Sequence, residues 1–161
     1  MEHATINTMT LLVNFKEKID LSKFYEELTL NKEITSIKLF TSKLKSDPTQ
    51  IVIDVNGIKI KISEAKAMMI GCKSIEAAVE VLDRFNLGYS KIQEILVNYS
   101  YNIPTIKDFS TLTDFKVEQK GRTYTLKYKN NTFFIVRNTV TQISSSVKEA
   151  QDAYNVLSKY L

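Results

Sequence analysis

Few side chains in this 161-residue sequence could perform chemistry, and those few stand apart from one another. His3 is the sole histidine and Cys72 the sole cysteine, so no neighbouring histidine in the sequence could activate the Cys72 thiol. Acidic pairs such as Glu26-Glu27 fall on the surface of an expected helix. The sequence holds no metal-ligand spacing, glycine-rich phosphate loop or nucleophile elbow. We therefore expect no enzyme, no cofactor and no metal site.

The lysines allow a different chemistry, which is the binding of an anionic partner. Apolar and basic residues alternate over 58–62, and this is the pattern of a strand with one buried face. The isoleucines must face the core, because burying unpaired Lys59 and Lys61 would be costly. Lys59, Lys61 and Ser63 would then face the open side, either binding phosphates or only keeping an exposed sheet soluble. The related positions later in the chain are Phe134, Val136 and Asn138.

The composition permits such a partner without requiring one. The formal net charge is +4, a mild excess of positive charge. A single cysteine excludes a disulfide framework and indicates a reducing, intracellular compartment. No apolar run approaches the roughly 20 residues of a membrane span, and no signal-peptide pattern opens the sequence.

The elements that would position these residues occur twice in the same order. The apolar run 9–15 is echoed by 93–99, and a short helical pattern follows each run. Asp20 is the expected N-cap of the first of these helices, and Thr105 with Asp108 resembles a capping box for the second. The expected hairpin turns are Asn56-Gly57 and Asn130-Asn131, between strands at 34–40, 50–55, 58–62 and 67–70 and at 115–119, 123–128, 133–137 and 140–143.

Each half closes with an amphipathic helix. In the second half, Ser146 with Glu149 forms a capping box. Met68 and Met69, in the strand before the first closing helix, are expected in the core. The expected apolar stripes are Ile75, Ala78, Val79, Leu82 and Phe85 in the first helix and Ala150, Ala153, Tyr154 and Leu157 in the second.

These elements predict an α+β fold made of two repeats, 1–88 and 89–161. One curved antiparallel sheet is expected, with every helix packed on a single face. The opposite face would stay uncovered, and an uncovered face of that size usually has a partner.

The order of elements resembles the TATA-binding protein family, including its relatives in large DNA viruses. The run 6–15 is similar to the first strand of the family, and Ile92-Gln93 to the start of its second-repeat strand. Ile19-Asp20-Leu21 resembles the start of the first helix of the family. The run 70–74 resembles the Thr-Gly-Ala-Lys-Ser run before its long helix. The resemblance covers residues 5–160 and implies a saddle-like sheet with helices on the convex face.

The resemblance also implies a function, which is the binding of promoter DNA through the concave face during transcription initiation. The family inserts phenylalanines between base steps and bends the duplex, as minor-groove binders do. The implied DNA-binding residues are Thr8, Thr10, Lys59, Lys61, Ser63, Leu96, Phe134, Val136 and Asn138.

The sequence departs from the family at the residues that bend DNA. The four phenylalanine positions fall near Gln50, Ser63, Arg122 and Asn138, and Phe40, Phe133 and Phe134 are the candidate substitutes. The minor-groove asparagines fall at Thr8 and Glu94, and a carboxylate facing phosphates would oppose binding unless it is paired or tilted away.

The resemblance further implies a nucleus or a viral transcription site as the location, and other initiation factors as partners of the convex helices and loops. Two alternatives stay open. One is a protein-interaction subunit that keeps the fold without bending DNA. The other is a pocket protein that holds an apolar ligand between sheet and helices.

Overall fold

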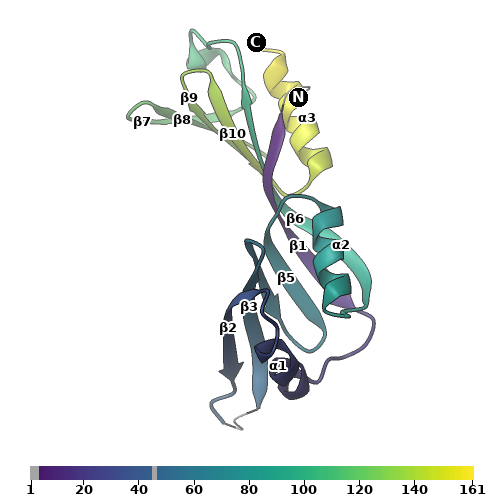
Figure 1. The fold of residues 1–161 in the computed structure, drawn as a ribbon. Coiled ribbons are helices and arrows are strands. Elements are labelled where there is room, and N and C mark those ends of the chain that lie inside the picture. Colours follow the sequence, from purple (N-terminus) through teal and green to yellow (C-terminus); the bar gives the residue numbers. More distant parts are fainter. Residues whose placement is uncertain (1–3, 45–46) are drawn as a thin grey trace. The chain divides into compact units, whose positions relative to one another are not determined.

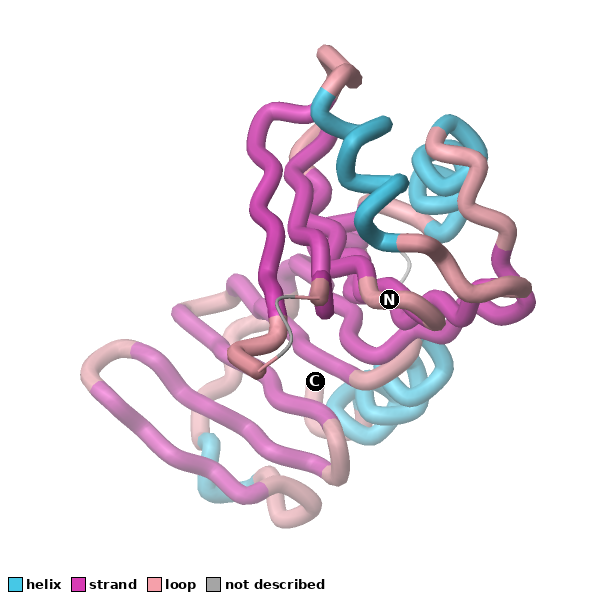
Figure 2. The backbone as a smooth tube through the Cα atoms, turned by 90° about the horizontal axis from the view of Figure 1, so that it is seen from below, coloured by secondary structure: helices cyan, strands magenta, loops and turns pink. Residues whose placement is uncertain are grey.

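The computed structural model describes residues 4–44 and 47–161. Over these residues the chain forms an antiparallel arrangement of strands with helices (Figures 1 and 2). The hydrogen-bonded strand order is β2-β3-β4-β5-β1-β6-β10-β9-β8-β7. In chain order the elements are β1 (Thr5–Phe15), α1 (Leu21–Thr29), β2 (Ile34–Thr41), β3 (Pro48–Val55), β4 (Ile58–Ile62), β5 (Lys66–Cys72), α2 (Ile75–Arg84), β6 (Tyr89–Asn102), the 3-10 turn η1 (Phe109–Thr111), β7 (Lys116–Lys120), β8 (Thr123–Tyr128), β9 (Asn131–Val136), β10 (Thr139–Ser144) and α3 (Val147–Ser158).

The chain divides into two compact units, and the division passes through β1 and β6. The N-terminal unit is 10–93, and the C-terminal unit joins 94–161 to the first residues of the chain, up to Met9. The repeat boundaries expected from the sequence, 1–88 and 89–161, stay a prediction.

In the N-terminal unit, strict alternation sends one set of side chains into the core. Leu11, Val13, Ile53 and Ile60 are all fully buried, together with their neighbours on β3, β4 and β5. Helix α1 packs on β2 and β3, and α2 packs on β5, so both helices cover this face (Figure 1). The expected strands of this half are confirmed, and so is the N-cap Asp20, whose Oδ1 accepts from the Lys23 amide at 3.2 Å.

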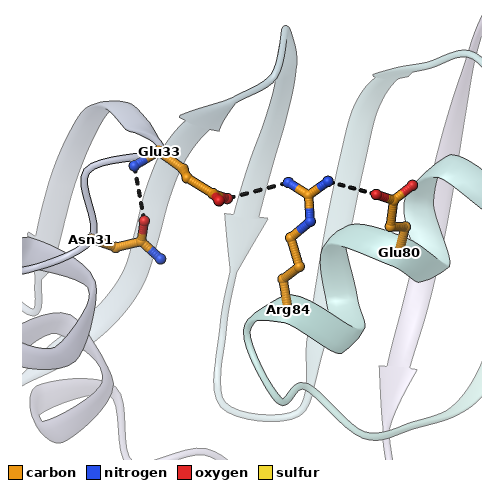
Figure 3. A network of polar contacts seen from close by, with 4 residues as sticks. All are labelled: Asn31, Glu33, Glu80 and Arg84. Atoms are coloured by element: carbon orange, nitrogen blue, oxygen red, sulfur yellow. Dashed lines mark hydrogen bonds and ion pairs between the residues drawn. The ribbon is translucent and has the colours of Figure 1, made fainter.

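An ion-pair network ties α2 to the segment that leads into β2. Arg84 donates from Nη1 to Glu33 Oε2 at 3.2 Å and from Nη2 to Glu80 Oε1 at 2.6 Å (Figure 3). The Asn31 side chain accepts from the Glu33 amide at 2.9 Å and holds that segment in a turn. The network is exposed to solvent, so it orients α2 more than it stabilises the unit.

The C-terminal unit has the same plan, with α3 packed on β9 and β10. Leu126, Phe133, Ile135 and Val140 are fully buried beneath it. Ser146 caps α3 by accepting from the Glu149 amide at 3.2 Å, as expected, while the Glu149 carboxylate accepts from the Ser145 hydroxyl.

The expected helix after β6 is wrong. The structure has only the three-residue turn η1, capped by Asp108, whose Oδ1 accepts from the Ser110 amide at 2.9 Å, and Thr105 lies outside it. The residues that follow bring Leu112 and Phe115 into the core without a helical stripe. Two apolar side chains therefore complete the core here, whereas in the N-terminal unit the amphipathic helix α1 does so.

Three finer predictions also need correction. The turn between β8 and β9 is Lys129-Asn130, with Lys129 at φ 50°, and Asn131 is a buried residue of β9. In α2 the buried residues are Ala78, Val81 and Leu82. Of the expected stripe, Ile75 is 37% exposed and Val79 is only half-buried, and Val81 is buried instead. In the α3 stripe, Ala150, Ala153 and Leu157 are buried, and Tyr154 instead contacts the edge of Tyr101 with ring centroids 5.4 Å apart.

Candidate nucleic-acid interface

Each unit has one sheet face that its helices leave uncovered, which we call the helix-free face. In an antiparallel pair, residues directly opposite each other lie on the same face. The register therefore shows which side chains share a face with Lys59 and Lys61, since the isoleucines of β4 point into the core.

In the N-terminal unit, the helix-free face carries lysines on β2 and β4. Lys59 lies opposite Asp54 and Ile70, and Lys61 lies opposite Val52 and Met68. Lys38 lies opposite Val52 from the other side. The prediction that Lys59 and Lys61 face away from the core is confirmed, and Lys38 joins them although the sequence argument did not single it out.

In the C-terminal unit, the helix-free face is formed by threonines around two apolar residues. Phe134 lies between Thr125 and Thr141, and Val136 lies between Thr123 and Thr139. Phe134 is 37% exposed and Val136 is 42% exposed. Both lie on the face that the sequence predicted for them.

The lysines of this unit lie on its outer strands. Lys116, Glu118 and Lys120 of β7 are opposite Lys127, Thr125 and Thr123 of β8, which puts them on the same face as Phe134. Lys116 Nζ is 3.6 Å from Glu118 Oε1. Sequence reasoning missed these lysines, although the alternation of 116–120 carries the signal.

Three more of the expected site residues, Thr8, Thr10 and Leu96, lie on the central strands β1 and β6. Thr8 Oγ1 accepts from Asn98 Nδ2 at 3.1 Å within the C-terminal unit. Thr10 and Leu96 are both half-buried. Thr10 is a β1 residue of the N-terminal unit and Leu96 a β6 residue of the C-terminal unit.

Two of the expected site residues lie in turns. The Ser63 hydroxyl donates to the Lys66 carbonyl at 3.0 Å in the β4–β5 turn. Asn138 lies in the β9–β10 turn, next to Arg137 at φ 57°, and its carbonyl accepts from the Ile103 amide at 2.8 Å.

Matching the β3–β4 and β8–β9 hairpins by register places Val136 at the position equivalent to Ser63, and Thr123 at that of Gln50. The equivalences with Asn138 and Arg122 are therefore wrong. The same register relates Lys59 to Thr132 and Lys61 to Phe134, and not to Phe134 and Val136 as expected.

The carboxylate that would oppose phosphates is occupied elsewhere. Glu94 Oε2 accepts from the backbone amide of Val147, the first residue of α3, at 3.0 Å. A carboxylate at a helix N-terminus is stabilised by the helix dipole and by the free amides there. Glu94 is thus paired within the C-terminal unit.

The candidate wedge residues divide between core and surface. Phe133 is fully buried and so cannot act as a wedge. Phe134 and Phe40 lie on helix-free faces, and Phe40 is 48% exposed opposite Gln50.

The two methionines of β5 lie on opposite faces. Met69 is in the core as expected, but Met68 is half-buried on the helix-free face, so its prediction was wrong.

The remaining groups that could perform chemistry are the cysteine, the histidine and the carboxylates. Cys72 is buried, and burial raises the pKa of its thiol to about 11. Within residues 4–44 and 47–161, no three His, Cys, Asp or Glu side chains gather as a metal site. His3 lies outside the described residues. No helix of the described chain is both long and apolar enough to cross a membrane.

Comparison with known proteins identifies the fold. No family model and no curated protein sequence matches this chain. Among solved structures, it is similar to the TATA-binding protein of Methanococcus jannaschii, with a TM-score of 0.69 over 96% of this chain and 95% of that one. The two sequences are 11% identical, so the likeness is one of fold. This chain therefore has the α+β fold of the TATA-binding protein.

Proposed function

We propose that this protein binds double-stranded promoter DNA along its helix-free faces and acts as a general transcription factor in transcription initiation. One observation carries the proposal: in a fold like that of the TATA-binding protein, each unit collects three lysines and one carboxylate on its helix-free face. These residues are Lys38, Lys59, Lys61 and Asp54 in the N-terminal unit and Lys116, Lys120, Lys127 and Glu118 in the C-terminal unit.

Lysines placed in this way supply affinity for phosphates through the release of counterions. Threonine hydroxyls on the helix-free face of the C-terminal unit and the Asn98 amide of β6 are able to donate to base edges or to phosphate oxygens. The pairing of Glu94 with α3 supports the proposal, because the amide and the dipole at the helix N-terminus offset part of its negative charge.

The helices and loops on the opposite side of each unit are the proposed docking surface for other initiation factors. The proposed location is the nucleus or a viral transcription site. Both statements extend the resemblance to the TATA-binding protein and rest on the fold similarity.

A gel-shift assay with AT-rich and GC-rich duplexes across a salt series tests DNA binding. The double variant Lys59→Glu with Lys61→Glu is expected to weaken binding and to lower the slope of log affinity against log salt by about 2, because each lost phosphate contact lowers it by about 0.9. Lys148→Glu with Lys159→Glu, at exposed positions of α3 and its C-cap, is the matched control and should bind normally. Absence of binding by the native protein even at low salt would refute the proposal.

A second candidate is a protein-interaction subunit that keeps the fold and does not bend DNA. The observation in its favour is that Gln50, Ser63, Thr123 and Val136, which occupy the expected wedge positions, include no aromatic residue. Energy transfer between dyes at the two ends of a duplex separates the two candidates. Binding with bending supports the first candidate, and binding without bending supports the second.

A further inference from the structure

The helix-free face of the C-terminal unit has a single large aromatic ring at its centre. Phe134 is 37% exposed, whereas the adjacent Phe133 is fully buried on the other side of the strand. The cross-strand neighbours of Phe134 are Thr125 and Thr141, and Thr132 precedes it on the same face. Threonine side chains are short, so they leave part of the Phe134 ring accessible to a partner.

Positive charge borders this ring on one side. Lys127 is a diagonal neighbour of Phe134 across β8 and β9, at a typical separation of about 7–8 Å. Lys116 and Lys120 lie one strand further out, about 10 Å from β9. These separations suit a nucleic-acid strand that stacks one base on the Phe134 ring and places its phosphates near the lysines.

The lysine border contains an unfavourable contact in the free protein. Lys116 and Lys127 lie directly opposite each other on β7 and β8, and like charges in such a pair are destabilising. Glu118 offsets part of this, with Oε1 at 3.6 Å from Lys116 Nζ. One carboxylate against three lysines leaves a surplus of positive charge that an anion would neutralise.

From this geometry we infer that the C-terminal unit binds an unpaired nucleic-acid strand by stacking a base on Phe134, with backbone phosphates at Lys127, Lys116 and Lys120. An aromatic ring on a positively charged sheet is a general solution for single strands, since every base has a π-face. In a duplex, neighbouring bases stack on one another and leave no base face free. The Phe134 ring, in the middle of the sheet, can therefore stack only on a base that is unpaired or unstacked. This inference does not depend on the binding of promoter duplexes.

Fluorescence anisotropy with a labelled oligothymidylate of about 16 nucleotides tests the inference on the full chain. Phe134→Ala should weaken binding roughly 5- to 150-fold, the range expected for the loss of one base–aromatic stack. Phe134→Tyr keeps the ring and should keep the affinity. Val147→Ala is the matched control, because Val147 is 39% exposed, has no ring and lies on α3, away from the helix-free face.

The phosphate contacts are tested by salt dependence. Lys116→Gln with Lys127→Gln should lower the salt slope for the oligothymidylate, whereas Lys148→Gln on α3 should leave it unchanged. No binding of the oligothymidylate at low salt, or equal losses for Phe134→Ala and Val147→Ala, would overturn the inference. An AT-rich duplex measured in parallel distinguishes the two proposals. Binding of the duplex alone refutes the single-strand site, and binding of the oligothymidylate alone refutes the promoter function.

Discussion

The cores of the two units differ at positions that their registers make equivalent. In the N-terminal unit Met69 lies opposite Ile60, and in the C-terminal unit Gln142 lies opposite Phe133. All four side chains are fully buried, but only Gln142 is polar. The same fold thus encloses an apolar core in one unit and a buried amide in the other.

The buried amide is satisfied by three partners. Gln142 Oε1 accepts from the Tyr101 hydroxyl at 2.7 Å, and Gln142 Nε2 donates to Asn131 Oδ1 at 3.2 Å and to the Ala150 carbonyl of α3 at 2.9 Å. This network connects β6, β9, β10 and α3. A buried hydrogen bond to Ala150 therefore adds to the apolar packing of α3, whereas the exposed Arg84 network adds to that of α2.

The helix-free faces differ in a complementary way. The positions of Lys59 and Lys61 on β4 correspond to Thr132 and Phe134 on β9. Positive charge lies on β4 and the edge strand β2 in the N-terminal unit, and on the outer β7 and β8 in the C-terminal unit. A shared fold thus tolerates exchange of charge between strands, because side chains on this face do not support the core.

The largest effect is expected when the buried amide is replaced by the residue of the other unit. Gln142→Met should lower the free energy of unfolding by about 3 kcal/mol or more, because the Tyr101 hydroxyl and the Asn131 carbonyl oxygen each lose a partner in a buried place. Urea unfolding followed by circular dichroism measures the change. Met69→Leu is the control, with an expected cost below about 1.5 kcal/mol. Similar values for both variants would show that the network contributes little.

The second effect concerns Gly71, whose equivalent in the C-terminal unit is Ser144. Gly71 has φ +90°, and a Cβ there would lie 3.2 Å from the Gly57 carbonyl oxygen. Gly71→Ala should therefore cost about 2 kcal/mol, from backbone strain together with this close approach. Gly121→Ala is the matched control, with φ +60° and no atom within 4 Å of the added Cβ. If the control loses as much stability, strain alone explains the result.

A smaller effect is expected at the exposed network of α2. Hydrogen bonds that Arg84 donates to Glu80 and Glu33 raise the pKa of its guanidinium further, so it stays charged at every pH of interest. Arg84→Gln should shift the urea midpoint slightly downward at low ionic strength, and the shift should disappear in high salt. A shift that persists in high salt would mean that packing of the arginine stem, and not its charge, is what α2 loses.

The smallest effect is a pH dependence at η1, the counterpart of α1. Hydrogen bonds from the Ser110 hydroxyl and amide hold the pKa of the Asp108 carboxyl below its usual range. A lowered folded-state pKa contributes stability above the unfolded pKa of about 3.9, and this contribution is lost as the pH falls through the folded value. Asp108→Asn should thus be less stable than the native chain near pH 6 and equal to it near pH 2. A constant difference between the two proteins over this range would contradict the assignment.

Much of the fold is readable from the sequence because the elements are locally encoded. Alternation over 58–62, the caps Asp20 and Ser146, and the Asn56-Gly57 turn each specify their own structure. The helix expected near Thr105 failed because a capping pattern needs an apolar stripe behind it, and only Leu112 and Phe115 reach the core there. The turn at Lys129-Asn130 was displaced by one residue because two adjacent asparagines suit a turn equally well.

The candidate site was less readable for a different reason. Faces follow from alternation, so Lys59, Phe134 and Val136 were placed on the correct side. Turn residues such as Asn138 obey no alternation, and the pairing of Glu94 with Val147 joins residues far apart in the chain. Such contacts depend on the tertiary arrangement, which local patterns do not encode.

The division of β1 between the units governs how the chain could be cut into pieces. Residues up to Met9 belong with 94–161, where Thr8 is hydrogen-bonded to Asn98. A fragment that begins at the second repeat would present β6 as a bare edge strand, open to pairing with another chain. Adding a short peptide with the sequence of residues 4–9 would supply the missing strand, so the two pieces should restore a folded unit by complementation.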